Sequence, residues 1–245
     1  MIMLRMMIKR KCERTHAEDR YLALVLATSA GLLNAMALGA FGIFPSHMTG
    51  NTSQLSSEVS SVDFKGLMFL LAIITAFVIG CVTSRLTGLW GIKNKIRTIF
   101  SIILLTEGIM LMMLSAFETF FFATRNNREV IVFLGFLMGI HNATSTQLSN
   151  GRVRSTHVTG TLTDAGIALG SVLSALFQRD RSQPMAPQCQ QFVTHLVTIT
   201  SFLTGGIAGL LLFNQFGFSS MIAVGGFLVL IAISSIVVTV RIARY

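Results

Sequence analysis

The sequence predicts an all-α integral membrane protein with six transmembrane helices arranged as two inverted three-helix repeats. Of its 245 residues, 52% are hydrophobic and only 12% are charged. A soluble domain carries about twice this share of charged residues, which cover its surface. In addition, the apolar residues form six continuous stretches, and one pair of motifs occurs twice in the same order.

The six apolar stretches are long enough for membrane helices, each of which needs about 20 mostly apolar residues. They are continuous runs, whereas the strands of a membrane β-barrel alternate apolar and polar residues over about ten positions. The predicted helices cover residues 21–40, 66–84, 98–117, 130–147, 192–213 and 219–240.

Residues 1–20 are basic and precede an apolar run, so they also fit the start of a signal peptide, with Ala35-Met36-Ala37 as a cleavage site. We expect no cleavage, because the apolar run from Tyr21 to Phe44 is longer than a typical signal core and belongs to the repeat described below. Residues 1–20 are therefore predicted to form a basic cytoplasmic tail.

The basic residues predict the orientation of the chain. Sixteen of the nineteen Lys and Arg residues lie in the N-terminal segment, the second and fourth loops and the C-terminal tail, and only three lie in the alternate loops. Because basic loops remain in the cytoplasm, both termini are predicted to be cytoplasmic. The net charge of +9 therefore indicates membrane orientation, and no basic stripe interleaved with aromatic residues favours nucleic acid as a partner.

The repeat consists of Gly-x-x-Asn-Ala at 31–35 and 139–143, followed by [Ser/Thr]-His-x-Thr-Gly at 46–50 and 156–160. Such a pair is typical of a duplicated three-span unit. Since three spans separate the copies, the second copy is inverted in the membrane, as in several secondary transporter folds. We expect the repeats to cover residues 21–128 and 129–245.

The polar connections after the first and fourth spans predict broken or re-entrant segments. A helix is expected to start after each His-x-Thr-Gly, with Thr49 or Thr159 as its N-cap. In the second copy a short helix is expected at 162–177, with Gly166 and Gly170 on a close-packing face. Two such helix N-termini would approach the membrane midplane from opposite sides and present free N–H groups.

Glu107 is the only carboxylate well within a predicted span. A charge in the membrane interior is costly, so we expect this side chain to be paired, protonated or turned inward. One hypothesis is a proton or cation site, and the other is a structural hydrogen bond to a Thr or Asn of a neighbouring helix. His141 and His195 have no counterpart in the other copy and are expected to matter less.

The polar residues of the repeated motifs allow two interpretations each. The imidazoles either titrate near neutrality or contact a ligand, or they hold the break in the helix. The Asn side chains either contact a ligand or bond across the repeat interface. Asp164 is expected to close a capping turn that begins at Thr161. Arg152 and Arg154 either attract an anion or set topology and contact lipid head groups.

A ligand site is therefore predicted between the two halves, with no metal and no cofactor. Its candidate residues are Asn34, Ser46, His47, Thr49, Gly50, Asn51, Glu107, Asn142, Thr156, His157, Thr159, Gly160, Thr161 and Asp164.

The motif pair at 46–52 and 153–164 resembles the YoaK-like family of bacterial integral membrane proteins, over residues 21–240. The resemblance implies a multi-pass protein of the bacterial inner membrane with about six spans. It implies no substrate and no mechanism.

The leading functional hypothesis is a small secondary transporter or permease for an unknown solute, with proton coupling through Glu107. The alternative is a non-transporting partner or sensor protein in which the motifs are structural. An enzyme is not expected, because the sequence has no phosphate-binding loop and neither a zinc-protease nor a serine-hydrolase motif. The lipid bilayer is an expected partner, and a homo-oligomer is compatible with the sequence.

Overall fold

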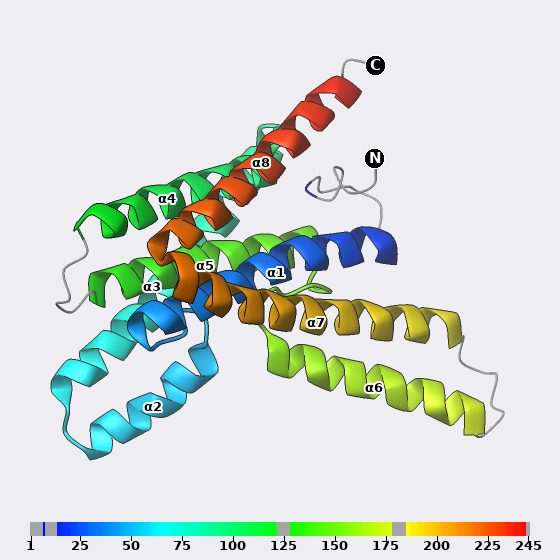
Figure 1. Cartoon of the computed structure of the whole chain (residues 1–245). Coiled ribbons are helices and arrows are strands. Elements are labelled where there is room, and N and C mark those ends of the chain that lie inside the picture. The colour runs from blue at the N-terminus through cyan, green and yellow to red at the C-terminus, as the bar shows by residue number, and fades with distance from the viewer. Residues whose placement is uncertain (1–6, 8–13, 122–127, 178–184, 244–245) are drawn as a thin grey trace.

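The computed structural model describes residues 7, 14–121, 128–177 and 185–243, and all regular structure in these ranges is helical (Figure 1). The predicted tail 1–20 therefore lies largely outside the described residues. The eight helices of the described chain are α1 His16–Phe41, α2 Met48–Ser60, α3 Phe64–Lys93, α4 Ile99–Phe121, α5 Arg128–Leu148, α6 Val158–Phe177, α7 Met185–Phe216 and α8 Phe218–Ala243.

Six of these helices are long and apolar enough to cross a membrane, namely α1, α3, α4, α6, α7 and α8. Large apolar side chains such as Leu86, Ile167 and Leu211 are exposed on their outer faces, where only a lipid environment removes them from water. The chain is thus a multi-pass membrane protein whose apolar helices contact the bilayer, and the predicted fold class is confirmed at this level.

The six apolar helices and the six predicted spans differ at one position. The stretch 130–147 forms α5 but is not apolar enough to be among the six, whereas α6 is. The polar residues His141, Thr144 and Ser145 of α5 are buried, so this helix faces protein and does not need an apolar surface. The other five predicted spans correspond to α1, α3, α4, α7 and α8, which are all longer than predicted.

The prediction for 162–177 was partly wrong. This segment is helical, but α6 begins at Val158. A Cβ added at Gly166 or Gly170 would meet no atom within 4 Å, so these glycines do not form a close-packing face. Ala165 and Ala168 are the buried small residues of this helix.

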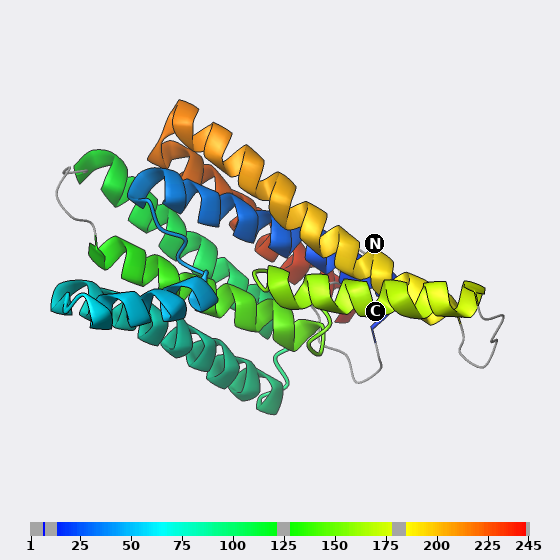
Figure 2. The same cartoon turned by 90° about the horizontal axis from the view of Figure 1, so that it is seen from below.

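The long helices pack in three main pairs: α1 with α7, α3 with α5, and α4 with α8 (Figures 1 and 2). Of the two remaining helices, α2 lies against α3 and α6 lies against α7. Among the six apolar helices, α1 has the most buried span and α6 the least. The molecule therefore has an inner layer, to which α1 and α5 contribute, and a lipid-facing outer layer.

Glycines allow the backbones of α1 and α7 to touch. A Cβ added at Gly31 would overlap the carbonyl oxygen of Phe202, and one added at Gly205 would overlap that of Thr28. Membrane helices associate largely through close packing, which small residues at the crossing allow. The hydrophobic effect does not drive this association, because lipid tails are as apolar as the helix surfaces.

The crossing of α5 and α3 is built in the same way. A Cβ at Gly139 would overlap the carbonyl oxygen of Phe77, and one at Gly80 would overlap that of Phe136. Between α4 and α8, Gly108 and Gly225 face each other, and a Cβ on either would come within 3 Å of the other's carbonyl oxygen.

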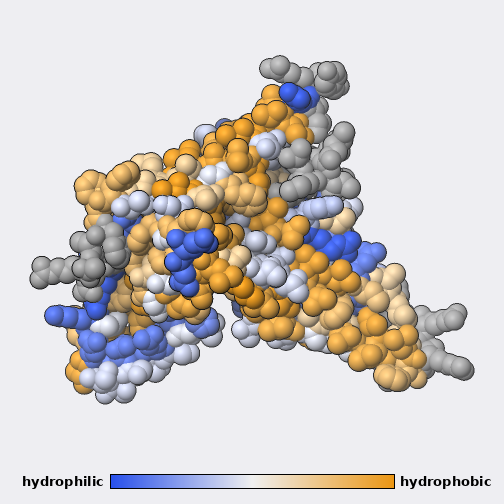
Figure 3. All heavy atoms as spheres, viewed as in Figure 1, coloured by the Kyte–Doolittle hydropathy of each residue, from blue (hydrophilic) through white to orange (hydrophobic). Residues whose placement is uncertain are grey.

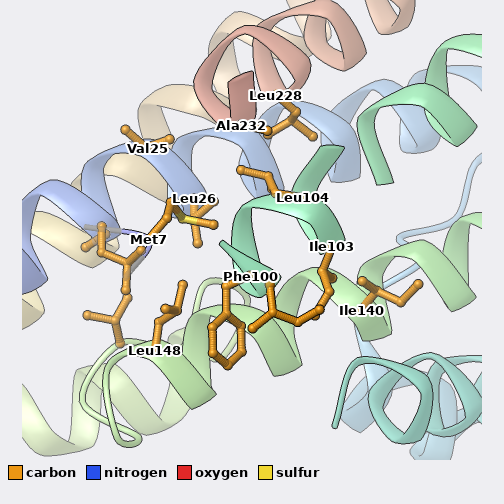
Figure 4. Packing of buried hydrophobic residues seen from close by; sticks show 14 residues of the cluster. Met7, Val25, Leu26, Phe100, Ile103, Leu104, Ile140, Leu148, Leu228 and Ala232 are labelled. Atoms are coloured by element: carbon orange, nitrogen blue, oxygen red, sulfur yellow. The ribbon is translucent and has the colours of Figure 1, made fainter. Parts of the chain in front are cut away.

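Two clusters of buried apolar side chains fill the space between the helix pairs. One includes Leu26, Phe100, Leu104 and Leu148, which Figure 4 shows converging from α1, α4 and α5. The other includes Leu33 of α1 and Val224 of α8. Together they connect the α1–α7, α3–α5 and α4–α8 pairs into one bundle.

We predict that Gly31→Ala and Gly139→Ala each destabilise the protein by about 1–3 kcal/mol or more, because the added methyl overlaps a backbone oxygen that cannot move freely. Thermal unfolding in detergent measures the effect. The matched control is Gly166→Ala, which has open space and should be neutral or slightly stabilising. Equal melting temperatures for all three variants would contradict the close crossings.

Candidate functional site

The starts of α2 and α6 lie near each other, without contact, in the middle of the molecule, and the two helices run from there in opposite directions (Figures 1 and 2). Figure 3 shows a hollow between two lobes at this place, with polar residues over α2 on one side and apolar residues over α6 and α7 on the other. These two helix starts carry the repeated His-x-Thr-Gly motifs.

The helices begin earlier than predicted. His47 occupies the N-cap position of α2 and makes no side-chain capping bond, and α6 begins at Val158, one residue after His157. The prediction of Thr49 and Thr159 as N-caps is wrong, since both residues lie in the first helical turn, where they are exposed. The backbone carbonyls of the two histidines instead accept the first helical bonds, from Asn51 N and Thr161 N at 2.9 and 3.0 Å.

Each motif glycine makes room for the imidazole of its own motif. A Cβ at Gly50 would overlap the His47 ring, and a Cβ at Gly160 would lie 2.5 Å from Nε2 of His157. Both histidines are exposed. The spacing of His and Gly therefore folds each ring back over the first turn of its helix and leaves it accessible.

The two motif asparagines hold the loops that precede these helix starts. Oδ1 of Asn34 accepts bonds from the Ser46 amide at 3.2 Å and the Ser46 hydroxyl at 2.9 Å. Oδ1 of Asn142 accepts a bond of 3.5 Å from the Ser155 hydroxyl. The predicted bonds across the repeat interface are therefore replaced by bonds within each half, which pin the loop to the preceding helix. Thr156, beside Ser155, is half-buried.

Asn51 and Thr161 occupy matching buried positions in the first turns of α2 and α6. The Thr161 hydroxyl donates to the carbonyl of His157 at 2.8 Å. The Asn51 side-chain NH₂ is buried, and no described residue accepts a hydrogen bond from it. The capping turn predicted from Thr161 to Asp164 is absent, because both residues lie inside α6, and Asp164 is exposed.

Glu107 is paired with His141, which was expected to matter less because it has no counterpart in the other repeat. Its Oε1 lies 2.7 Å from Nδ1 of His141, and Nε2 of the same ring lies 2.9 Å from the carbonyl oxygen of Leu26. Both side chains are almost fully buried, and Oε2 of Glu107 has no hydrogen-bond partner in the part of the chain that the structure describes. The expected Thr or Asn partner is thus wrong. The sequence held one indication of this pair: Glu107 and His141 both lie in predicted spans, and neither has a polar counterpart in the other repeat.

A second buried ionic cluster joins the start of α1 to the loop before α6. Asp19 is fully buried, and its two carboxylate oxygens lie 3.0 Å from Nε of Arg14 and 2.7 Å from Nε of Arg152. Thr15 and Glu18 cap the same helix start reciprocally. Arg152 is therefore occupied by Asp19 and is not free for a ligand, whereas Arg154 is exposed.

Two apolar pockets are described, and both lie away from the His-x-Thr-Gly segments. One has a volume of about 650 Å³ and lies between α3 and α5, lined by residues such as Phe69 and Phe133. The other, of about 440 Å³, lies between α1, α7 and α8. Within the described ranges, no three His, Cys, Asp or Glu side chains gather in a way that could hold a metal ion.

His195 is a further buried polar residue. It lies on α7, and neither ring nitrogen has a hydrogen-bond partner among the described residues. It has no counterpart in the other repeat, and it interacts electrostatically with Asp164 of α6, about two turns beyond the start of that helix.

A family model described as a protein of unknown function, DUF1275, matches residues 22–234. No curated protein and no solved structure matches the chain. The match neither names the YoaK-like family nor gives a source, so that resemblance and the bacterial origin stay predictions.

We predict that Gly160→Ala changes stability little but displaces the His157 ring. The ring is exposed and can turn away from the new methyl, and Ala stabilises a helix relative to Gly by about 0.5–1 kcal/mol. NMR of ¹³C,¹⁵N-labelled histidine should show a shifted His157 Cε1–Hε1 signal at an almost unchanged melting temperature. Gly170→Ala, on the same helix but far from the ring, serves as the control. An unshifted His157 signal in Gly160→Ala would disprove the packing of ring on glycine.

Proposed function

The chain belongs to the DUF1275 family of proteins of unknown function, and we propose that it is a small secondary transporter of two inverted halves, residues 21–128 and 129–245. In this proposal α1, α3, α4, α5, α7 and α8 cross the membrane, and α2 and α6 are re-entrant. Both termini are cytoplasmic, in a bacterial inner membrane, as the distribution of basic residues favours.

The helix pairs support two equivalent halves. If α1 to α4 are exchanged with α5 to α8, the pair α1–α7 becomes α5–α3, the pair α2–α3 becomes α6–α7, and α4–α8 becomes itself. The crossings agree in detail, since Gly31 touches Phe202 as Gly139 touches Phe77. Such exchange of packing is expected of an inverted duplication.

The single observation that carries the transporter proposal is the position of the two helix starts. The starts of α2 and α6 point toward the same region near the middle of the molecule without touching each other, and the helices run apart (Figures 1 and 2). Broken helices whose N-termini meet near the midplane form the substrate sites of several secondary transporters. We place the solute site between His47 and His157.

Glu107 and His141 form the proposed coupling site. A carboxylate bonded to an imidazole inside a membrane protein can take up and release a proton, and such pairs are typical of proton pathways. Each member of the pair has an apolar counterpart in the opposite half. The repeat places Leu33 for His141, and the Gly108–Gly225 crossing places Val224 for Glu107. The pair therefore breaks the symmetry of the halves, and each chain would carry one such site.

The alternative function, a non-transporting sensor or partner protein, has one specific observation in its favour. Asn34 bonds Ser46 and Asn142 bonds Ser155, so these motif residues have a structural role whatever the function. An enzyme is not proposed, because the paired carboxylate and imidazole are sealed from substrate on the described chain. A homo-oligomer is compatible with either function.

We predict that Glu107→Val and His141→Leu each lower the free energy of unfolding by about 3–5 kcal/mol, because each leaves one member of a buried pair alone. The double variant copies the apolar Val224 and Leu33 and should recover most of the loss. Chemical or thermal denaturation of the four proteins forms a double-mutant cycle. Strictly additive losses would contradict a direct interaction between the two side chains.

The transporter proposal predicts uptake in proteoliposomes under an imposed proton gradient, measured on a solute library with a pH-sensitive dye inside the vesicles. Glu107→Gln should abolish proton movement with the solute and retain solute binding, since only the titratable group is lost. Glu129→Gln, at an exposed position in the first turn of α5, is the control. If no solute moves, and His47→Ala and His157→Ala alter stability alone, the sensor or partner function replaces the transporter.

A further inference from the structure

We infer that the solute held at the starts of α2 and α6 is an oxyanion, that is, a carboxylate or a phosphate group. This inference rests on the proposed transporter function and adds the chemical class of its substrate. It combines the dipoles of the two helices, the unpartnered amide of Asn51 and the charge of Arg154.

The first contribution is the positive end of each helix. Backbone N–H groups at a helix N-terminus point outward, and the aligned peptide dipoles place about half a positive charge there. Neither α2 nor α6 has an acidic residue in its first turn that would neutralise this charge. Because the two starts lie near each other without touching, an anion between them would be attracted by two dipoles, whereas a cation would be repelled by both.

The second contribution is Asn51. Its side chain is 95% buried, and its Nδ2 has no hydrogen-bond partner among the described residues. A buried donor without a partner costs about 1–3 kcal/mol, so a ligand that accepts this bond gains from it. A side chain in a helix leans toward the N-terminus of that helix, which directs this amide to the start of α2. The unused group is a donor, and a donor selects an acceptor such as a carboxylate or phosphate oxygen.

The third contribution comes from the loop before α6. Arg152 is held by Asp19, which it shares with Arg14, but Arg154 is exposed and forms no ion pair with any described residue. Its carbonyl accepts a bond from His157 N at 3.4 Å, which ties it to the start of α6. The one acidic residue of α6, Asp164, lies about two turns beyond the start, so the local charge at the motif is positive.

The coupling pair fits an anionic solute. The interior of a cell is electrically negative, which opposes the entry of an anion unless its charge is compensated. A proton taken up at Glu107 and His141 supplies this compensation. The Glu107–His141 pair and the oxyanion site at the starts of α2 and α6 then serve the same transport cycle, although no described contact joins them.

The test is binding to the purified wild-type protein in neutral detergent, followed by thermal shift and titration calorimetry. One arm varies the anion at constant sodium: chloride, phosphate, sulfate, acetate and succinate. The other varies the cation at constant chloride: sodium, potassium, ammonium, choline and arginine. We expect a saturable shift with an oxyanion of the first arm alone. Phosphate and sulfate then distinguish a phosphate-type site from the carboxylate site that acetate and succinate report.

Asn51→Asp replaces the donor by a negative acceptor of the same shape and should weaken oxyanion binding by about 10- to 100-fold. Asn214→Asp, an exposed residue on α7, is the matched control and should bind as wild type. If Asn51→Asp does not fold, Arg154→Gln should still weaken binding up to about fivefold, whereas Arg241→Gln on α8 should not.

Two results would overturn the inference. The first is saturable binding of a cation and of no oxyanion, with Asn51→Asp neutral or favourable. The second is the absence of a shift with every anion of the panel. Neither result decides whether the protein is a transporter. The proteoliposome experiment decides that, because it follows uncharged and cationic solutes as well, so a failure of the oxyanion inference can be distinguished from a failure of the transporter proposal.

Discussion

The fold depends on direct contact between helix backbones. In a bilayer, lipid tails are as apolar as the side chains they replace, so helices associate through close packing and hydrogen bonds. Here Gly31 and Gly205 bring α1 onto α7, and Gly139 and Gly80 bring α5 onto α3. These contacts surround α1 and α5 with protein, and their buried faces can therefore carry Asn, Thr, Ser and His residues that lipid would not tolerate.

The repeated Gly-x-x-Asn motif connects this packing to the candidate site. Residues three apart lie on neighbouring positions of one helix face, so each glycine that makes a crossing is followed by an asparagine on almost the same side. Asn34 then binds Ser46, and Asn142 binds Ser155, so the loops fold back along the helices that precede them. The positions of the α2 and α6 starts thus follow from the same short motif that holds the bundle together.

The sequence predicted the membrane class, five of the six apolar helices and the segments that carry the motifs, because long apolar runs and exact repeats are local signals. Burial is not local. The sequence predicts a span over α5 because the first half of this helix is apolar. Its second half is polar, and the helices that bury it are α1, α3 and α4, which lie elsewhere in the sequence. The pairing of Glu107 with His141 joins residues 34 positions apart, and comparison of the repeats discounted His141 because it has no counterpart.

Departures from symmetry are as informative as the symmetry. Leu33 and Val224 occupy the positions that correspond to His141 and Glu107, and they pack in an ordinary apolar cluster. The bundle therefore does not require an ionic pair at this level, and an isolated buried pair is costly compared with apolar packing. The helices after the motifs also differ, since α2 is a short polar helix and α6 is a 20-residue apolar one. A pair that the scaffold does not need, present between α4 and α5 but not at the equivalent positions of α8 and α1, is most simply explained by a function that acts once per chain, such as the uptake of a proton on one route through the protein.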